Sequence, residues 1–139
     1  MTSNSNLSCE TTVLEKRTEG IILEIRFNGV HHWKHGNEML DYIQEAIETH
    51  NPAAIVINLL EYEYIFGNDI FAPIFFALHD QKQGSIRPCS VVAVGHTAKS
   101  LESLIDASNI RTLGKINIKI LKNIEAAQEE IRRHLSISS

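Results

Sequence analysis

Few cysteines, no excess of positive charge and no long apolar run are found in this sequence, and each of these absences argues against a class of protein. The 139 residues include two cysteines, Cys9 and Cys89. Cys9 lies in a polar leader and Cys89 opens an expected core strand, so the pair does not suggest a disulfide framework. The formal net charge is −4, and a mildly acidic chain is a poor candidate for binding the phosphate backbone of a nucleic acid.

Targeting signals are also lacking. Residues 1–10 are rich in Ser, Thr and Asn, and they have neither the basic start nor the apolar core of a secretory signal. No apolar run approaches the roughly 18 residues of a membrane span. We therefore expect a cytoplasmic protein without membrane insertion, with a disordered leader over residues 1–10, one domain over residues 11–135 and a frayed tail over residues 136–139.

Strand-like and helix-like patterns alternate along the chain. Residues 21–27 alternate apolar and polar side chains, as strands do, and residues 53–60 form an apolar run broken by Asn58, which is typical of a central strand. Further strands are expected near residues 12–14, 89–94 and 116–120, and helices near residues 37–50, 70–78, 98–107 and 123–135. This order predicts an α/β fold, with a mostly parallel mixed sheet of about five strands covered by about four helices.

Local signals predict where some of these elements begin. Asn37, Thr97 and Asn123 are the expected N-caps of three helices, because their side chains can accept a hydrogen bond from a backbone N–H of the first turn. The polar residues 79–88 predict a loop. The clean alternation over residues 116–120 predicts a strand near an edge of the sheet.

The most informative stretch is residues 52–78, which we interpret as a buried strand, an exposed turn and a buried helix. The turn combines carboxylates with aromatic side chains: Glu61, Tyr62, Glu63, Tyr64, Phe66 and Asp69. Exposed aromatic side chains anchor protein interfaces, so the turn is a candidate protein-binding surface. The alternative interpretation is that Tyr64 and Ile65 pack inward and the acids are merely solvated.

Metal and catalytic sites have less support. His31 and His35 would share one face of a helix at a spacing that zinc can use, but no Cys is near and no zinc-protease motif is present. An exposed polar loop is favoured there, and no cofactor is expected. His96 follows an expected strand, where α/β proteins place ligands, but the nucleophile motif G-x-S-x-G is absent. Catalysis is therefore not expected.

A small-ligand or anion sensor is the alternative function. Gly67, Asn68 and Asp69 place backbone N–H groups at a helix N-terminus, which attracts anions. Asp69 is itself an anion at that position and would repel a phosphate. The glycine-rich phosphate-binding motifs are also absent.

The order and spacing of the elements from about Gly20 to Arg133 resemble the STAS domain, which is the fold of anti-sigma-factor antagonists and of sulfate-transporter C-terminal domains. The matching segments are residues 21–29 (the family's second strand and its Gly-ended turn), 54–59 (the third strand), 91–95 with the helix that follows, and 118–131 (the final strand and helix). The family usually has an Asp near Asn58.

The resemblance also implies where a regulatory switch would lie. In family members regulated by phosphorylation, the turn reads approximately Asp-Ser-Ser-Gly or Asp-Ser-Thr-Gly, and a partner kinase modifies the first hydroxyl. These positions fall on Phe66, Gly67, Asn68 and Asp69, and none of them matches. Gly67 has no hydroxyl, so this modification is chemically impossible there. Asp69 supplies a fixed charge that is at most a partial mimic of a phosphate.

We therefore expect a non-catalytic, phosphorylation-independent STAS-like module that acts in bacterial signal transduction and transcription regulation through protein–protein contact. The expected contact residues are Tyr64, Phe66, Gly67, Asn68 and Asp69, with the exposed face of the helix behind them. The expected partner is a regulatory protein such as an anti-sigma kinase or a signalling scaffold. A homodimer is also compatible with this interpretation of the sequence. The alternatives are the sensor and an enzyme built around His96.

Overall fold

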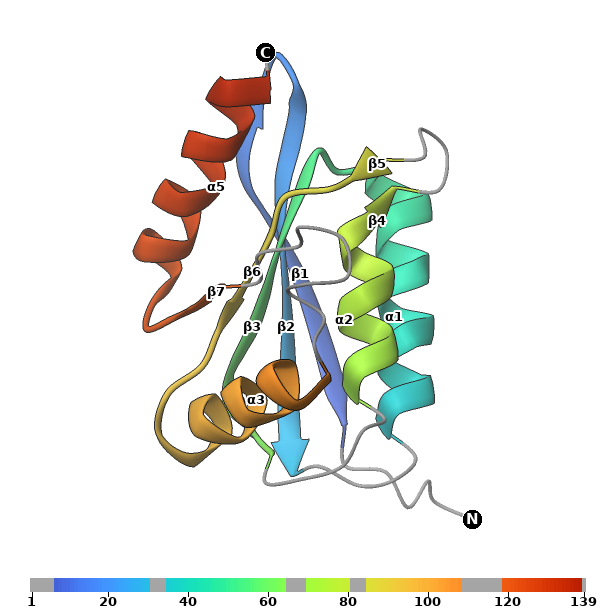
Figure 1. Cartoon of the computed structure of the whole chain (residues 1–139). Helices are drawn as coiled ribbons and strands as arrows, with labels where there is room; N and C mark the ends of the chain where they lie inside the picture. Colours follow the sequence, from blue (N-terminus) through green and yellow to red (C-terminus); the bar gives the residue numbers. More distant parts are fainter. Residues whose placement is uncertain (1–6, 31–34, 65–69, 81–84, 109–118, 139) are drawn as a thin grey trace.

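The computed structural model describes residues 7–30, 35–64, 70–80, 85–108 and 119–138, and a five-stranded sheet forms its centre (Figure 1). In chain order the elements are β1 (Ser8–Arg17), β2 (Gly20–Val30), α1 (His35–His50), β3 (Ala54–Glu63), α2 (Phe71–Leu78), β4 (His79–Asp80), β5 (Ser85–Ile86), β6 (Cys89–Val92), α3 (Gly95–Ser108), β7 (Lys119–Leu121) and α5 (Ile124–Ser138). The strand order is β1-β2-β3-β6-β7, with β1 antiparallel to β2 and the other neighbours parallel. The α/β fold with a mostly parallel mixed sheet is confirmed.

Both ends of the described chain have more regular structure than the sequence predicted. β1 begins at Ser8, within the expected leader, because Ser8 and Cys9 pair with Asn28 and Phe27 of β2. α5 continues to Ser138, where fraying was expected. Three residues of the predicted strand 116–120 lie outside the described residues, and its remainder belongs to β7, which forms an edge of the sheet as expected.

The first helix differs from expectation at its start and shows a regular end. α1 begins at His35, so Asn37 lies inside the first turn and is not the N-cap. The helix ends at His50, and Asn51 follows with φ of 45°, donating its N–H to Ile47 O at 2.8 Å. This left-handed residue after the helix is a common C-terminal cap that Asn tolerates well.

A small hairpin replaces the polar loop that was predicted for residues 79–88. β4 and β5 pair His79 with Ile86 and Asp80 with Ser85. Arg87, which follows, is buried, and its guanidinium donates to Ala77 O at 2.8 Å and to Pro52 O at 3.3 Å. The hairpin is thus tied to the end of α2 and to the segment that enters β3, through backbone carbonyls that helix or strand bonding leaves available.

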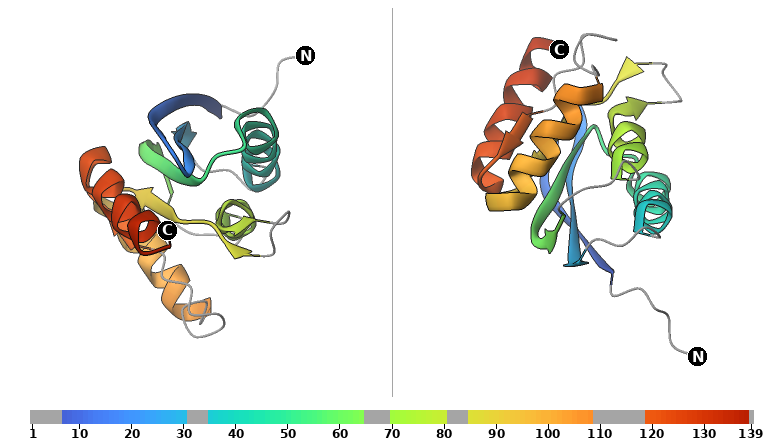
Figure 2. Two further views of the ribbon diagram at one scale, coloured as in Figure 1. Left: turned by 90° about the horizontal axis from the view of Figure 1, so that it is seen from above. Right: turned by 60° about the horizontal axis from the view of Figure 1, so that its bottom comes forward.

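Helices cover both faces of the sheet (Figure 2), and a separate core lies on each face. The larger core lies between the sheet and α1, α2 and α3, and receives Leu23, Ile25 and Phe27 from β2. The smaller core lies under α5 and receives Ile22 from the same strand. Alternate side chains of a strand point to opposite faces, so β2 supplies both cores.

The helix α5 covers the amino-terminal half of its sheet face. β7 is short and ends at Leu121, level with Val92 of β6, and the chain then turns back into α5 (Figure 1). Asn123 is the N-cap of α5, as predicted, because its Oδ1 accepts a hydrogen bond from Ala126 N at 2.8 Å. The buried side chains of α5 contact the first residues of the parallel strands: Ile22, Ala54, Val56 and Val92. Beyond Val92, the sheet face is not covered by α5.

Candidate functional site

An extra residue in β3 sets the arrangement of the side chains before the predicted turn. Arg26 of β2 pairs with Asn58 of β3, but Asn28 pairs with Glu61, so β3 has one more residue than β2 between these pairs. This β-bulge shifts the alternation by one residue. The side chains of the larger core therefore change from the odd positions 55, 57 and 59 to the even positions 62 and 64.

Asn58 stabilises this bulge. Its Oδ1 accepts from the N–H of Leu60 at 2.9 Å, and its Nδ2 donates to Glu24 Oε2 at 2.7 Å. The bulge would otherwise leave the part-buried Leu60 N–H without a ladder partner, and Asn58 supplies one. Asn58 thus combines a donor and an acceptor, whereas an ionised Asp at this position would have no donor for Glu24.

Thr97 ties the end of β3 to the helix α3. Gly95, with φ of 61°, turns the chain from β6 into α3, and this φ favours glycine. The buried Thr97 hydroxyl accepts from Tyr64 N at 3.1 Å and donates to Tyr62 O at 3.1 Å. The predicted N-cap role of Thr97 is therefore wrong, because α3 begins at Gly95 and the hydroxyl bonds to β3 instead.

The predicted contact residues fall into two groups. Tyr64 is 1% exposed and belongs to the larger core, so the inward packing that the sequence left open is found for Tyr64, while Ile65 lies outside the described residues. Phe66, Gly67, Asn68 and Asp69 lie outside the described residues. The residues on either side of this segment, Tyr64 and Ile70, are both buried, so its two ends are fixed to the core.

His35 is part of a buried contact. It is 1% exposed, and its Nδ1 lies 2.9 Å from the hydroxyl of Tyr62, with the two rings tilted at 48°. His31, the other predicted metal candidate, lies outside the described residues. Within the described part of the chain, no group of three or more His, Cys, Asp or Glu side chains is arranged to hold a metal ion.

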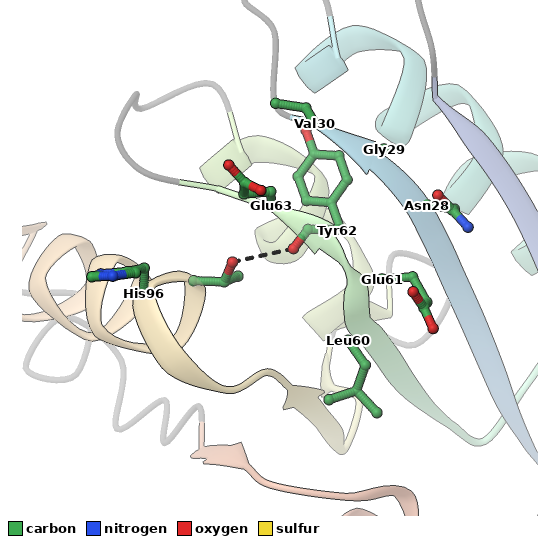
Figure 3. Close-up of a pocket in the computed structure, with 9 residues that line it drawn as sticks. Asn28, Gly29, Val30, Leu60, Glu61, Tyr62, Glu63 and His96 are labelled. Atoms are coloured by element: carbon green, nitrogen blue, oxygen red, sulfur yellow. Dashed lines mark hydrogen bonds between the residues drawn. The ribbon is translucent and has the colours of Figure 1, made fainter.

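The described residues around the predicted turn line an open hollow of about 560 Å³ (Figure 3). It lies at the carboxyl ends of β2 and β3 and beside the first turn of α3, and its lining consists of Asn28, Gly29, Val30, Leu60, Glu61, Tyr62, Glu63, His96 and Thr97. Glu61, Glu63 and His96 are exposed. Sequence reasoning named these acids and His96 separately. The strand ends bring them to one edge, where α/β proteins place their binding sites.

Neither cysteine has the properties of a catalytic nucleophile. Burial, followed by the negative charge of Glu45, raises the pKa of Cys9 to about 11. Burial raises the pKa of Cys89 to about 12. Both are therefore protonated at neutral pH, and the thiolate is the reactive form. Cys89 is 8% exposed and packs in the larger core, as its position in the sequence predicted.

Ion pairs hold α5 in place. Arg132 donates to Glu15 Oε2 of β1 at 2.6 Å through its Nε, and this bond is the main reason why the pKa of Glu15 is lowered. Lys119 of β7 lies 3.2 Å from Glu130, which also contacts Arg133 and His134. Burial of Glu130 raises its pKa, but the hydrogen bonds from Lys119 and His134 outweigh it, so the pKa of this carboxyl is lowered.

Comparison with known proteins identifies the fold. No protein-family model and no curated protein sequence matches the chain. Among solved structures, an anti-sigma factor antagonist from Mycobacterium paratuberculosis superposes with a TM-score of 0.64 at 13% sequence identity, covering 95% of this chain and 99% of that one. The chain therefore has a STAS-like fold, and the resemblance inferred from its sequence is confirmed at the level of the fold. Within the described residues, no helix is long and apolar enough to cross a membrane.

Proposed function

We propose that this protein is a non-catalytic STAS-like module that acts by binding a regulatory protein in the bacterial cytoplasm. The observation that carries the proposal is the superposition over 95% of the chain on an anti-sigma factor antagonist. An anti-sigma kinase or a signalling scaffold is the kind of partner that such a module would bind. Both cysteine thiols are protonated, and Thr97 uses its hydroxyl to join two backbone elements, which agrees with a binding role.

The proposed contact surface is the segment Phe66–Asp69 with the helix α2 behind it. Anchoring of Tyr64 and Ile70 in the core supports this assignment, because a segment fixed at both ends loses less conformational entropy when it binds. The module would work without phosphorylation of this segment, because the sequence contains no Ser or Thr between Asn51 and Ser85.

Partner capture from the native host tests this proposal. The wild-type chain should recover an anti-sigma kinase or a signalling scaffold, and the double variant Phe66→Ala with Asp69→Arg should lose it. A matched control is the single charge reversal Glu48→Arg on the exposed side of α1, which should retain the partner. Retention by a correctly folded Phe66/Asp69 variant would show that the contact surface lies elsewhere.

The alternative of an anion sensor has less support from the hollow at the carboxyl ends of β2 and β3. Its described lining carries the carboxylates of Glu61 and Glu63, which repel an anion. A sensor would also require a small metabolite to raise the melting temperature of the protein, since a ligand that binds only the folded state must stabilise it. Thermal shift measurements with sulfate, phosphate and nucleotides distinguish the two functions, since none should stabilise a pure protein-binding module.

A further inference from the structure

The sheet face beyond α5 carries an unusual combination of side chains. We call it the open face and define it by Glu10, Glu24, Arg26, Asn28, Val30, Leu60, Glu61, Glu63 and Val94. The pairing of β2 with β3 places Asn28 beside Glu61 and Val30 beside Glu63. These side chains lie on the side of the sheet opposite to the buried Tyr62 and Tyr64. The hollow of about 560 Å³ and a second one of about 330 Å³ share Asn28 and Glu61, so together they form one trough across β1, β2 and β3.

Apolar side chains are concentrated on this face. Five large apolar side chains are notably exposed among the described residues, and three of them, Val30, Leu60 and Val94, belong to the open face, at 60%, 40% and 48% exposure. Single exposed apolar residues are ordinary, but several gathered at one end of a molecule mark an interaction surface. The β-bulge contributes directly to this face, because the extra residue places Glu61 and Glu63 here and turns Tyr62 and Tyr64 into the larger core.

The charges on the same face have one predominant sign. Glu10 pairs with Arg26, and Glu24 accepts from Asn58, while Glu61 and Glu63 form no ion pair with a cation among the described residues. Four carboxylates and one guanidinium leave a charge of −3 at neutral pH. An occupant of this trough must therefore offer positive charge beside apolar side chains.

From these observations we propose that the open face is a second docking surface, which binds a segment of a partner protein whose apolar side chains are flanked by lysines or arginines. A second copy of this chain does not fit, because a two-fold contact through this face would place its acids against each other. Nucleic acid and anionic lipid are repelled by the same acids. This surface and the Phe66–Asp69 segment would let one module hold two proteins.

Titration with a designed peptide tests this proposal. The probe is an amphipathic helical peptide of about 18 residues made of leucine and lysine, long enough for about five helical turns. Binding is measured by calorimetry at two salt concentrations, and backbone amide shifts locate the contact. The shifts should map to the ends of β2 and β3 and to Val94, and added salt should weaken binding.

Variants separate this face from the other acidic surface of the molecule. The pair Glu61→Lys with Glu63→Lys should weaken peptide binding at least about tenfold, and Leu60→Ser about fivefold. The matched pair Glu45→Lys with Glu48→Lys on the exposed side of α1 should change it less than about twofold. All of these side chains are exposed, so the melting temperature of each variant should stay close to that of the wild type.

Several outcomes would overturn the proposal. Shifts gathered on α1 around Tyr42, equal losses from both charge-reversal pairs, or absence of binding at about 1 mM peptide would each do so. Self-association of the wild type that Leu60→Ser abolishes would make a second copy the occupant instead. The variant Phe66→Ala with Asp69→Arg should retain the peptide, and the Glu61/Glu63 variant should retain the partner bound at the turn. Failure of one surface is thus distinguishable from failure of the other.

Discussion

The two halves of β3 differ in what surrounds them. From Ala54 to Asn58 the strand is buried on both faces, by α1 and α2 on one side and α5 on the other. From Leu60 to Glu63 it is buried on one face and exposed on the other. The same strand thus holds the domain together at one end and presents side chains at the other. The change coincides with the β-bulge and with the level at which α5 begins.

Single-residue deletions should separate the two halves most strongly. Deleting Val56 turns Ile57 out of the larger core and Asn58 into it, and we expect the loss of most of the roughly 5–15 kcal/mol that stabilises a domain. Deleting Leu60 removes the extra residue of the bulge and keeps Tyr62 and Tyr64 on their side, so the domain should still fold. Circular dichroism on heating measures both. A Leu60 deletion that unfolds the protein would show that the bulge itself is required.

Truncating single side chains should show the same contrast between the two halves of β3, with smaller losses of stability. Ile57 is 2% exposed, and Ile57→Ala should lower the free energy of unfolding by about 2–5 kcal/mol, because it leaves a cavity in the larger core. Leu60→Ala should change it by less than about 0.5 kcal/mol. Urea denaturation with equal m-values provides the measurement. Similar losses for the two variants would mean that Leu60 is buried in solution.

The junction between β3 and α3 should show an intermediate effect. Thr97→Val removes the hydroxyl that bonds to Tyr64 N and Tyr62 O, and we expect a loss of about 1–3 kcal/mol, since both backbone groups are buried. Thr97→Ser keeps the hydroxyl and should restore more than half of it. The comparison of the two variants by urea denaturation excludes a purely steric cause. Equal losses would contradict the hydrogen-bonding role.

The smallest effect is expected where α5 is attached to β1 by charge. The folded-state pKa of Glu15 is lowered by the hydrogen bond from Arg132, so its stabilising contribution is present above the unfolded-state pKa of about 4.3 and is lost as pH falls through the folded-state value. Arg132→Gln should therefore be less stable than the wild type at pH 7 and nearly equal to it well below pH 4. Melting curves across this range measure the difference. A gap that persists at low pH would exclude the ion pair as its cause.

Periodicity predicted the parts of the fold that depend on local patterns. The alternation in β2, the apolar run of β3 and the helical spacing of α1 all appear in the structure, because each reflects one face buried against a neighbour. The start of β1 at Ser8 and the hairpin β4–β5 were missed, because pairing with a distant strand, or with a partner across a turn, fixes them.

The site was predicted less completely than the fold. The sequence singled out the acids and tyrosines after Leu60 but assigned Tyr64 to a surface. A signal was available, since the apolar positions 55, 57 and 59 are followed by the aromatic positions 62 and 64, and this change from odd to even requires one extra residue. The bond from Thr97 to β3 had no such signal, because it joins residues 33 and 35 positions apart.

The short β7 also bears on how the domain opens. Three paired residues, the smaller core and the ion pair between Arg132 and Glu15 join β7 and α5 to the sheet, and we expect this end to open more readily than β2 and β3. Such an opening would lengthen the trough by uncovering Ile22, Val56 and Val92, which adjoin the open face. Amide protons of α5 would then exchange with solvent faster than those of β2 and β3. A partner bound along the lengthened trough would increase the population of this opened form of the domain.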